Sequence, residues 1–221
     1  TLEKVTIANG YVAGPWPAPT EGGGLYNNGG SVSINNCTFS GNAASENGGA
    51  IFNKEGVLQV SHSTFYNNLA FPTFGTHFGG GAIKNDSGTV NIDSSTFYSN
   101  STVYGGGGAI QNASMGATAD IVITNSTFYS NSATDTNTRG GAVANSGGVY
   151  TITHSTFYSN SSAYWDPNVG GASIHNQWGS LTLRNTIVSS GTMGGNCSNF
   201  GTFTDDGNNI DSGTSCGLTA T

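Results

Sequence analysis

The sequence predicts an all-β fold, a right-handed parallel β-helix (β-solenoid) of about seven coils. The hexapeptide "STFYSN" occurs at 95–100, 126–131 and 155–160, with a near-copy "STFYNN" at 63–68. Apolar residues two apart recur at fixed distances before each copy, which is typical of a strand with one buried face. In addition, no stretch has the pattern of a helix of about ten residues.

The repeat unit explains why these strands must stack. Aligned on the Phe of the hexapeptide, successive units are 32, 26, 32, 31, 29 and 31 residues apart. One such unit cannot close a core alone, whereas stacked copies can. Strand pairing at about 4.8 Å per coil gives a rod of roughly 34 Å, and parallel crossovers favour right-handed winding. The stack predicts an inward aromatic column: Phe39, Phe65, Phe97, Phe128 and Phe157.

Two columns of asparagine accompany this core. One follows each aromatic residue by three positions: Asn42, Asn68, Asn100, Asn131 and Asn160. The other closes the block "GGAIFN" (48–53) and its copies: Asn27, Asn53, Asn85, Asn112, Asn145 and Asn176. Amides in register can donate to one coil and accept from the other, and Asn tolerates a left-handed corner. We interpret both columns as structural ladders, with a ligand site as the less favoured alternative.

The two blocks, Phe-x-x-Asn and Gly-Gly-Ala-(Ile/Leu/Val), resemble the paired repeat motifs of the chlamydial polymorphic outer-membrane proteins. They are also similar to bacterial secreted right-handed β-helix repeat proteins more widely. The resemblance is strong over residues 31–176 and weak in the first and last coils. It implies an extracellular, cell-surface passenger that acts in adhesion without catalysis. The chain departs from that family in lacking a C-terminal membrane barrel.

The cysteines and the last segment define the expected domain organisation. We expect the parallel β-helix to cover 1–190 and an irregular C-terminal cap to cover 191–221. A disulfide between Cys197 and Cys216 would staple that cap and suits an oxidising, extracellular setting. Cys37 occupies a small inward position filled by Ser in most other coils, which predicts a buried, inert thiol.

The first coil suggests how the rod is used. The segment "TLEKVTIANG" (1–10) already has the core pattern, with nothing before it to cover the strand edge. Natural proteins normally protect such edges, and head-to-tail pairing that does not close makes a filament. Either upstream coils were removed, or another molecule pairs with this edge; in the second case we expect the chain to associate with itself as a homopolymer.

An outward ribbon of Thr and Tyr follows the repeated strand. It contains Thr64, Tyr66, Thr96, Tyr98, Thr127, Tyr129, Thr156 and Tyr158. Such ladders stabilise sheets by themselves, and Tyr also suits a lateral packing or adhesion surface. Both interpretations stay open.

Aromatic residues gather in the inserts that lie between the Asn corner and the glycine block. They are Trp16, Phe71, Phe74, Phe78, Tyr104, Tyr164 and Trp165. These loops could contact sugars or a neighbouring subunit. The alternative is that they fold back as a small satellite core.

The charges exclude several classes of function. Only five residues are Lys or Arg and the formal net charge is −7, which disfavours nucleic acid and anionic membranes as partners. No apolar run approaches the roughly 18 residues of a membrane span. Asp86, Asp93, Asp120, Asp135 and Asp166 fall in different columns, and Asp205 and Asp206 are adjacent in a loop next to the cap. No metal-ligand or Ser/His/Asp spacing occurs. We expect no catalytic residue, metal or cofactor.

The sequence thus predicts a non-enzymatic extracellular structural protein, either a self-associating surface filament subunit or the rod of an adhesin. A carbohydrate-binding adhesin that uses the aromatic loops on surface glycans is the first alternative. A polysaccharide lyase or hydrolase is the second, because parallel β-helices often host such enzymes.

Overall fold

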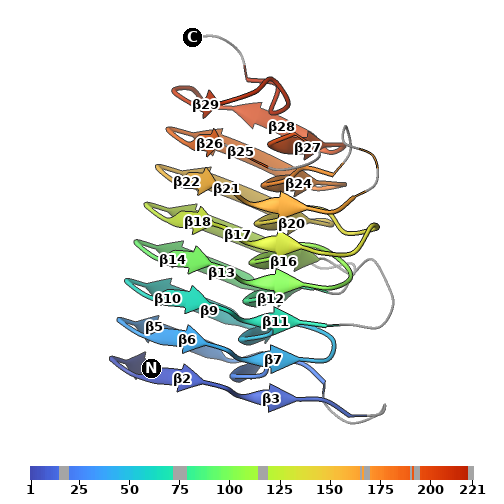
Figure 1. Cartoon of the computed structure of the whole chain (residues 1–221). Coiled ribbons are helices and arrows are strands. Elements are labelled where there is room, and N and C mark those ends of the chain that lie inside the picture. Colours follow the sequence, from blue (N-terminus) through green and yellow to red (C-terminus); the bar gives the residue numbers. More distant parts are fainter. Residues whose placement is uncertain are drawn as a thin grey trace.

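A computed structural model describes residues 1–14, 20–71, 79–113, 119–164, 166, 170–189, 191 and 195–218. Every paired strand in this part of the chain is parallel to its neighbours, and the coils stack from the N-terminus to the C-terminus (Figure 1). The predicted parallel β-helix is confirmed.

Each coil passes through four sheets in the order D, A, B and C. Sheet A contains β1 (Leu2–Glu3), β5 (Ser31–Asn35), β9 (Val57–Ser61), β13 (Thr89–Asp93), β17 (Asp120–Thr124), β21 (Val149–Thr153), β25 (Ser180–Arg184) and β28 (Thr202–Asp205). Sheet B contains β2 (Thr6–Ala8), β6 (Thr38–Ser40), β10 (Thr64–Tyr66), β14 (Thr96–Tyr98), β18 (Thr127–Tyr129), β22 (Thr156–Tyr158), β26 (Ile187–Ser189) and β29 (Ile210–Asp211).

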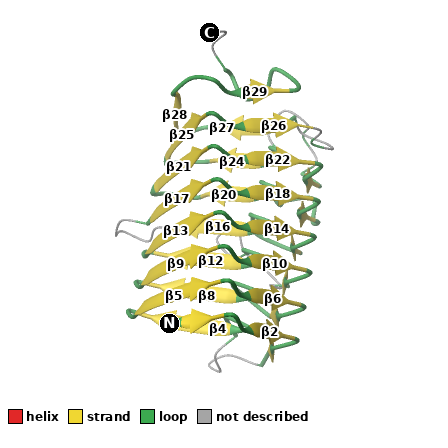
Figure 2. Cartoon of the chain, turned by 90° about the vertical axis from the view of Figure 1, so that its left-hand side faces the viewer, coloured by secondary structure: helices red, strands yellow, loops and turns green. Residues whose placement is uncertain are grey.

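The other two sheets are shorter. Sheet C contains β3 (Tyr11–Val12), β7 (Ala43–Ala44), β11 (Leu69–Ala70), β15 (Ser101–Thr102), β19 (Ser132–Ala133) and β23 (Ser161–Ser162). Sheet D contains β4 (Leu25–Asn28), β8 (Ile51–Lys54), β12 (Ile83–Asp86), β16 (Ile110–Ala113), β20 (Val143–Asn145), β24 (Ile174–Asn176) and β27 (Cys197–Asn199). Figure 2 shows how the strands of successive coils lie above one another.

The coil count differs slightly from the seven expected, because sheets A and B hold eight strands each. The extra rung comes from residues predicted to be an irregular cap. Strands β27, β28 and β29 pair with β24, β25 and β26, so the expectation of irregular structure is wrong for these three strands. The predicted disulfide is present between Cys197 and Cys216, and Cys37 is a free, buried thiol.

The predicted aromatic column forms one continuous stack. Phe97 pairs in register with Phe65 and Phe128, and the ring centroids lie 4.7 and 4.8 Å from it. All five phenylalanines of the column are fully buried. Offset aromatic stacking adds about 0.5–1.5 kcal/mol per pair to the burial of the rings.

Both predicted asparagine ladders are present, and both run in one direction. The Nδ2 of Asn68 donates to the Oδ1 of Asn100 at 2.9 Å, in the coil on its C-terminal side. The backbone N–H of Asn68 donates to the same oxygen at 3.1 Å. In the second ladder, the Nδ2 of Asn53 donates likewise to the Oδ1 of Asn85 at 2.8 Å. These bonds satisfy buried polar groups that would otherwise destabilise the core.

A third ladder was not predicted. The backbone N–H of Ser63 donates to the Oγ of Ser95 at 3.1 Å, and the N–H of Ser95 donates to the Oγ of Ser126 at 3.2 Å. Cys37 stands at the N-terminal end of this ladder and donates its N–H to the Oγ of Ser63 at 3.0 Å. The small inward serine side chains of this column therefore accept hydrogen bonds from the preceding coil, in addition to fitting the limited space.

One expectation about the corners is wrong. The asparagines of neither ladder are themselves left-handed. In the first ladder the residue before each one is, with φ 62° at Gly41, 55° at Asn67 and 53° at Ser99. A left-handed residue at that point turns the chain so that the next amide faces inward. The glycine pairs do allow the tight backbone geometry of a corner that is closed to other residues. Gly107 has φ 64°, and a Cβ on Gly108 would lie 2.1 Å from the carbonyl oxygen of Gly141.

Tyr150 places a polar hydroxyl in a core column that most other coils fill with Val, Ile or Leu. It fills an inward position on β21 at 1% exposure, and its hydroxyl has no hydrogen-bond partner among the described residues. Burial raises the pKa of this phenol well above its ordinary value. Because Tyr150→Phe removes an unsatisfied polar atom, we expect the free energy of unfolding to rise by about 1 kcal/mol in urea denaturation. Tyr98→Phe, on the outward ribbon, should change it by less than about 0.5 kcal/mol. A Tyr150→Phe protein less stable than the wild type would contradict the conclusion that the Tyr150 hydroxyl is buried and unsatisfied among the described residues.

Candidate functional site

The outward Thr and Tyr residues form a regular surface on sheet B. Thr64, Thr96 and Thr127 are register partners, as are Tyr66, Tyr98 and Tyr129. The rings of Tyr66 and Tyr98 stack at 5.0 Å and those of Tyr98 and Tyr129 at 4.9 Å. Desolvation, followed by the neighbouring Tyr129 and Tyr66, raises the pKa of Tyr98. Tyr98 is therefore uncharged at neutral pH. Its role in binding stays a prediction.

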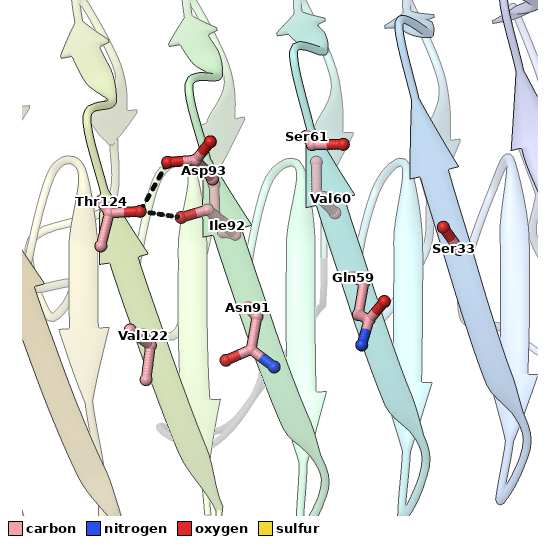
Figure 3. A pocket seen from close by; sticks show the side chains of 9 residues that line it. All are labelled: Ser33, Gln59, Val60, Ser61, Asn91, Ile92, Asp93, Val122 and Thr124. Carbon is pink, nitrogen blue, oxygen red and sulfur yellow. Dashed lines mark hydrogen bonds between the residues drawn. The ribbon is translucent and has the colours of Figure 1, made fainter.

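A shallow groove lies on sheet A, across the corner from this ribbon. It spans β5, β9, β13 and β17 and has a volume of about 240 Å³ (Figure 3). Val60 and Ile92 also border it, although their side chains point into the core. The polar residues that line it are Ser33, Gln59, Ser61, Asn91, Asp93 and Thr124. The apolar residue Val122 lines it as well.

Asp93 is the one ionisable group that lines this groove. Its Oδ1 accepts hydrogen bonds from the Oγ1 of Thr124 at 2.7 Å and the Nδ2 of Asn125 at 2.9 Å. Its Oδ2 accepts from the Oγ of Ser94 at 2.9 Å. These three bonds, with a smaller contribution from His62, hold the pKa of Asp93 below its ordinary value. The carboxylate is therefore fixed in position and ionised.

The amides of Gln59 and Asn91 line the same groove, with Asn91 two positions before Asp93 on β13 and Gln59 on the adjacent β9. The two residues are register partners on β9 and β13, and Figure 3 shows their side chains side by side on adjacent strands. Neither amide has a hydrogen-bond partner among the described residues. The repeat pattern of the sequence does not predict this groove. The only available signal was a run of amide residues at an outward column where other coils carry Ser, Thr or Val.

The aromatic residues of the inserts are only partly described. Trp16, Phe74, Phe78 and Trp165 lie outside the described residues. Phe71 stacks on Tyr11 with ring centroids 5.9 Å apart. The guanidinium of Arg139 lies 4.3 Å from the ring centroid of Tyr164, and its Nη2 donates to the Tyr164 hydroxyl at 2.6 Å. The described contacts do not join Phe71, Tyr104 and Tyr164 into one cluster.

The ends of several inserts cover part of sheet D. Isolated parallel bridges join Asn47 to Gly79, Gly79 to Gly106, and Gly106 to Arg139. A Cβ on Gly106 would lie 2.6 Å from the Oε1 of Gln111, so this backbone lies directly on the outer face of sheet D. The predicted alternative of a satellite layer therefore has structural support.

This covering layer buries an outward column of sheet D that the sequence analysis did not single out. Phe52, Lys84, Gln111, Ala144 and His175 occupy successive positions, each at most 4% exposed. Burial lowers the pKa of Lys84 to about 7, although Asp86 opposes the shift. Burial and the charge of Arg139 lower the pKa of His175 to about 3. His175 is therefore neutral in the folded protein.

The two ends of the rod differ. In the first coil, Val5 and Gly10 occupy positions where the next coils provide ladder oxygens from Ser63 and Asn42. In the last coil, Asn196 and Asn209 supply such oxygens, accepting from the N–H groups of Gly191 and Thr186. Cys216 is buried there and Leu218 packs on the same core.

The remaining acidic residues do not form a shared site. Asp205 accepts from the Nδ2 of Asn209 at 2.6 Å and so shapes its own turn. Asp206 lies 3.9 Å from the guanidinium of Arg184, with both side chains exposed. No group of three or more His, Cys, Asp or Glu side chains within the described ranges could hold a metal ion. Because these ranges contain no helix, none of them forms one that could cross a membrane.

Comparison with known proteins supports the resemblance seen in the sequence. The model of the Chlamydia polymorphic membrane protein repeat matches residues 36–54, which run from the corner before β6 to the end of β8. No curated protein and no solved structure matches the chain. The match covers part of one coil, and the same two motifs recur in register along the rod. The chain is thus a β-helix repeat protein similar to the Chlamydia polymorphic membrane proteins, a similarity that indicates a surface-associated protein.

Proposed function

We propose that this chain is the non-catalytic rod of an extracellular adhesin, with the Thr/Tyr ribbon of sheet B as its contact face. The observation that carries the proposal is the stacking of Tyr66, Tyr98 and Tyr129 on a rigid, ladder-bonded support. Aromatic side chains that are already ordered lose little entropy on binding. Tyr is also enriched in protein interfaces.

The electrostatics support a binding role over catalysis. Hydrolysis of a glycoside commonly requires two carboxyl groups about 5–10 Å apart, whereas Asp93 is the one carboxylate that lines the groove of sheet A. The hydrogen bonds to Asp93 keep it ionised, which is unsuited to a general acid near neutral pH. A lyase or hydrolase is therefore the less favoured alternative.

Adhesion is measured with beads coated with the protein and applied to a monolayer of cultured epithelial cells. Replacing Tyr98 and Tyr129 together by Ser should reduce the number of bound beads at least roughly fivefold, because it removes the centre of the aromatic face. Val149→Ser is the matched control, since Val149 is 43% exposed on sheet A, away from the ribbon. Equal binding by the wild type and the double variant, both folded by circular dichroism, would reject the ribbon as the contact face.

The filament form of the prediction has weaker support. Strands β1 and β2 each pair on one side only within the described part of the chain, and head-to-tail pairing of a second copy would use the other side. Against it, Val5 and Gly10 offer no ladder oxygen to an added coil, and Cys216 and Leu218 cover the opposite end. Sedimentation of the wild type and of a variant lacking residues 1–10 distinguishes the two outcomes. A monomeric wild type at high concentration would reject the filament.

The carbohydrate-binding adhesin that uses aromatic loops also stays a prediction. Four of the seven loop aromatics lie outside the described residues, and the contacts of Phe71 and Tyr164 join neighbours within the same chain. Those contacts favour a structural role for these two side chains.

A further inference from the structure

We infer that the groove on sheet A is a binding site for an uncharged, hydroxyl-rich glycan, recognised by Gln59, Asn91 and Asp93. The inference gives the proposed adhesin a second, chemically defined contact, and it rests on the surface exposure that the adhesin proposal assumes. It does not depend on the tyrosine ribbon.

The first argument is the free hydrogen-bonding capacity of the groove. The amides of Gln59 and Asn91 each offer donors and an acceptor, with no partner among the described residues. An amide that donates and accepts at once matches a pair of neighbouring sugar hydroxyls, since each hydroxyl can also do both. Ser61 donates to the Oδ1 of Asn35 at 3.0 Å, which leaves its own lone pairs free to accept.

The second argument is the position of the carboxylate. An ionised carboxylate has about four acceptor positions, and Asp93 uses three of them for Thr124, Asn125 and Ser94. The open position is on Oδ2. A hydroxyl bound there makes a charge-assisted hydrogen bond, roughly twice as strong as a neutral one. Because the other three bonds fix Asp93 beforehand, little entropy is lost on binding.

The third argument is charge, which decides the class of glycan. The groove is lined by one carboxylate and by no Lys, Arg or His, and the whole chain has a formal net charge of −7. A uronate or sulfated polymer would therefore meet a like charge with no cation to compensate it. The groove crosses four adjacent strands, so its shape suits a sugar chain that lies along the rod across several coils (Figure 3).

The test uses saturation-transfer NMR and calorimetry on the whole chain. The neutral probes are hexasaccharides of β-1,3-glucan, β-1,4-galactan and α-mannan; the acidic probes are oligogalacturonate and hyaluronan fragments. At least one neutral probe should bind, and Asn91→Ala and Gln59→Ala should each weaken it roughly tenfold. Thr182→Ala is the matched control, because Thr182 lies in the same outward column outside the groove.

Every result of these binding measurements either supports or contradicts the inferred glycan site. Binding of no neutral probe, tighter binding of an acidic probe, or equal loss in Thr182→Ala and Asn91→Ala would overturn it. The double ribbon variant separates this result from the adhesin proposal, since it should keep the wild-type sugar affinity. If that variant loses cell binding but not sugar binding, both stand. If sugar binding fails while the ribbon effect remains, only the groove is rejected.

Discussion

Asn100→Ala is expected to lower the free energy of unfolding by about 3–4 kcal/mol. The Oδ1 of Asn100 accepts from both the backbone N–H and the Nδ2 of Asn68. Its Nδ2 donates to the carbonyl oxygen of Phe65 and to the Oδ1 of Asn131, each at 3.0 Å. Alanine leaves the N–H of Asn68 without this partner in a fully buried position. A buried donor left unpaired costs about 1–3 kcal/mol, and the lost bonds of the Asn100 side chain add to it.

The measurement is urea denaturation followed by circular dichroism. Asn91→Ala is the matched control, because it removes the same side chain from the outer face of the neighbouring sheet, where it has no partner among the described residues. We expect that control to differ from the wild type by less than about 0.5 kcal/mol. A cost below about 1 kcal/mol for Asn100→Ala would mean that water replaces the ladder.

Alkaline pH is expected to stabilise the folded chain through Lys84. Burial lowers the pKa of this ammonium from 10.5 to about 7. Between these two values the unfolded chain binds a proton that the folded chain has released, so the free energy of unfolding rises with pH. Below about pH 7 the group is protonated in both states, and its contribution no longer changes. The gain between pH 7 and pH 10 is on the order of 4 kcal/mol.

Lys84→Met provides the comparison, since it keeps a long side chain and removes the titrating group. Every other ionisable residue is common to both proteins, so the difference between their pH profiles isolates Lys84. Denaturation in urea at half-unit steps from pH 7 to pH 10 should give a steeper rise for the wild type. Parallel profiles would show that Lys84 stays charged in the folded protein.

The sequence was sufficient to predict the coil and its inward columns. Phe97 and Phe128 are register partners because each unit places an apolar residue at the same point of the same strand. The amides of Asn68 and Asn100 meet for the same reason. When similar repeat units stack, residues that are one unit apart in the sequence lie directly above one another. One correct alignment of the units therefore predicts which residues share each column of the stack.

The sequence was not sufficient where the coils differ. Phe52, Lys84 and Gln111 share an outward column, and nothing in their periodicity predicts that Gly79 and Gly106 would cover it. The groove likewise depends on the sizes of neighbouring side chains, which a repeat pattern does not specify. The extra rung was missed because Asn196 and Asn209 come from turns and not from the repeated motif.

The common direction of the three ladders makes the coils chemically interchangeable. In each ladder the donors of one coil bond to side-chain oxygens of the coil that follows it in the chain. The asparagines of the first ladder also donate to a main-chain oxygen of the preceding coil, as Asn68 does to Phe39 and Asn100 to Phe65. Each coil therefore offers its two neighbours the same donors and acceptors. Removal of one whole repeat unit would bring together two coils whose hydrogen-bonding groups still match.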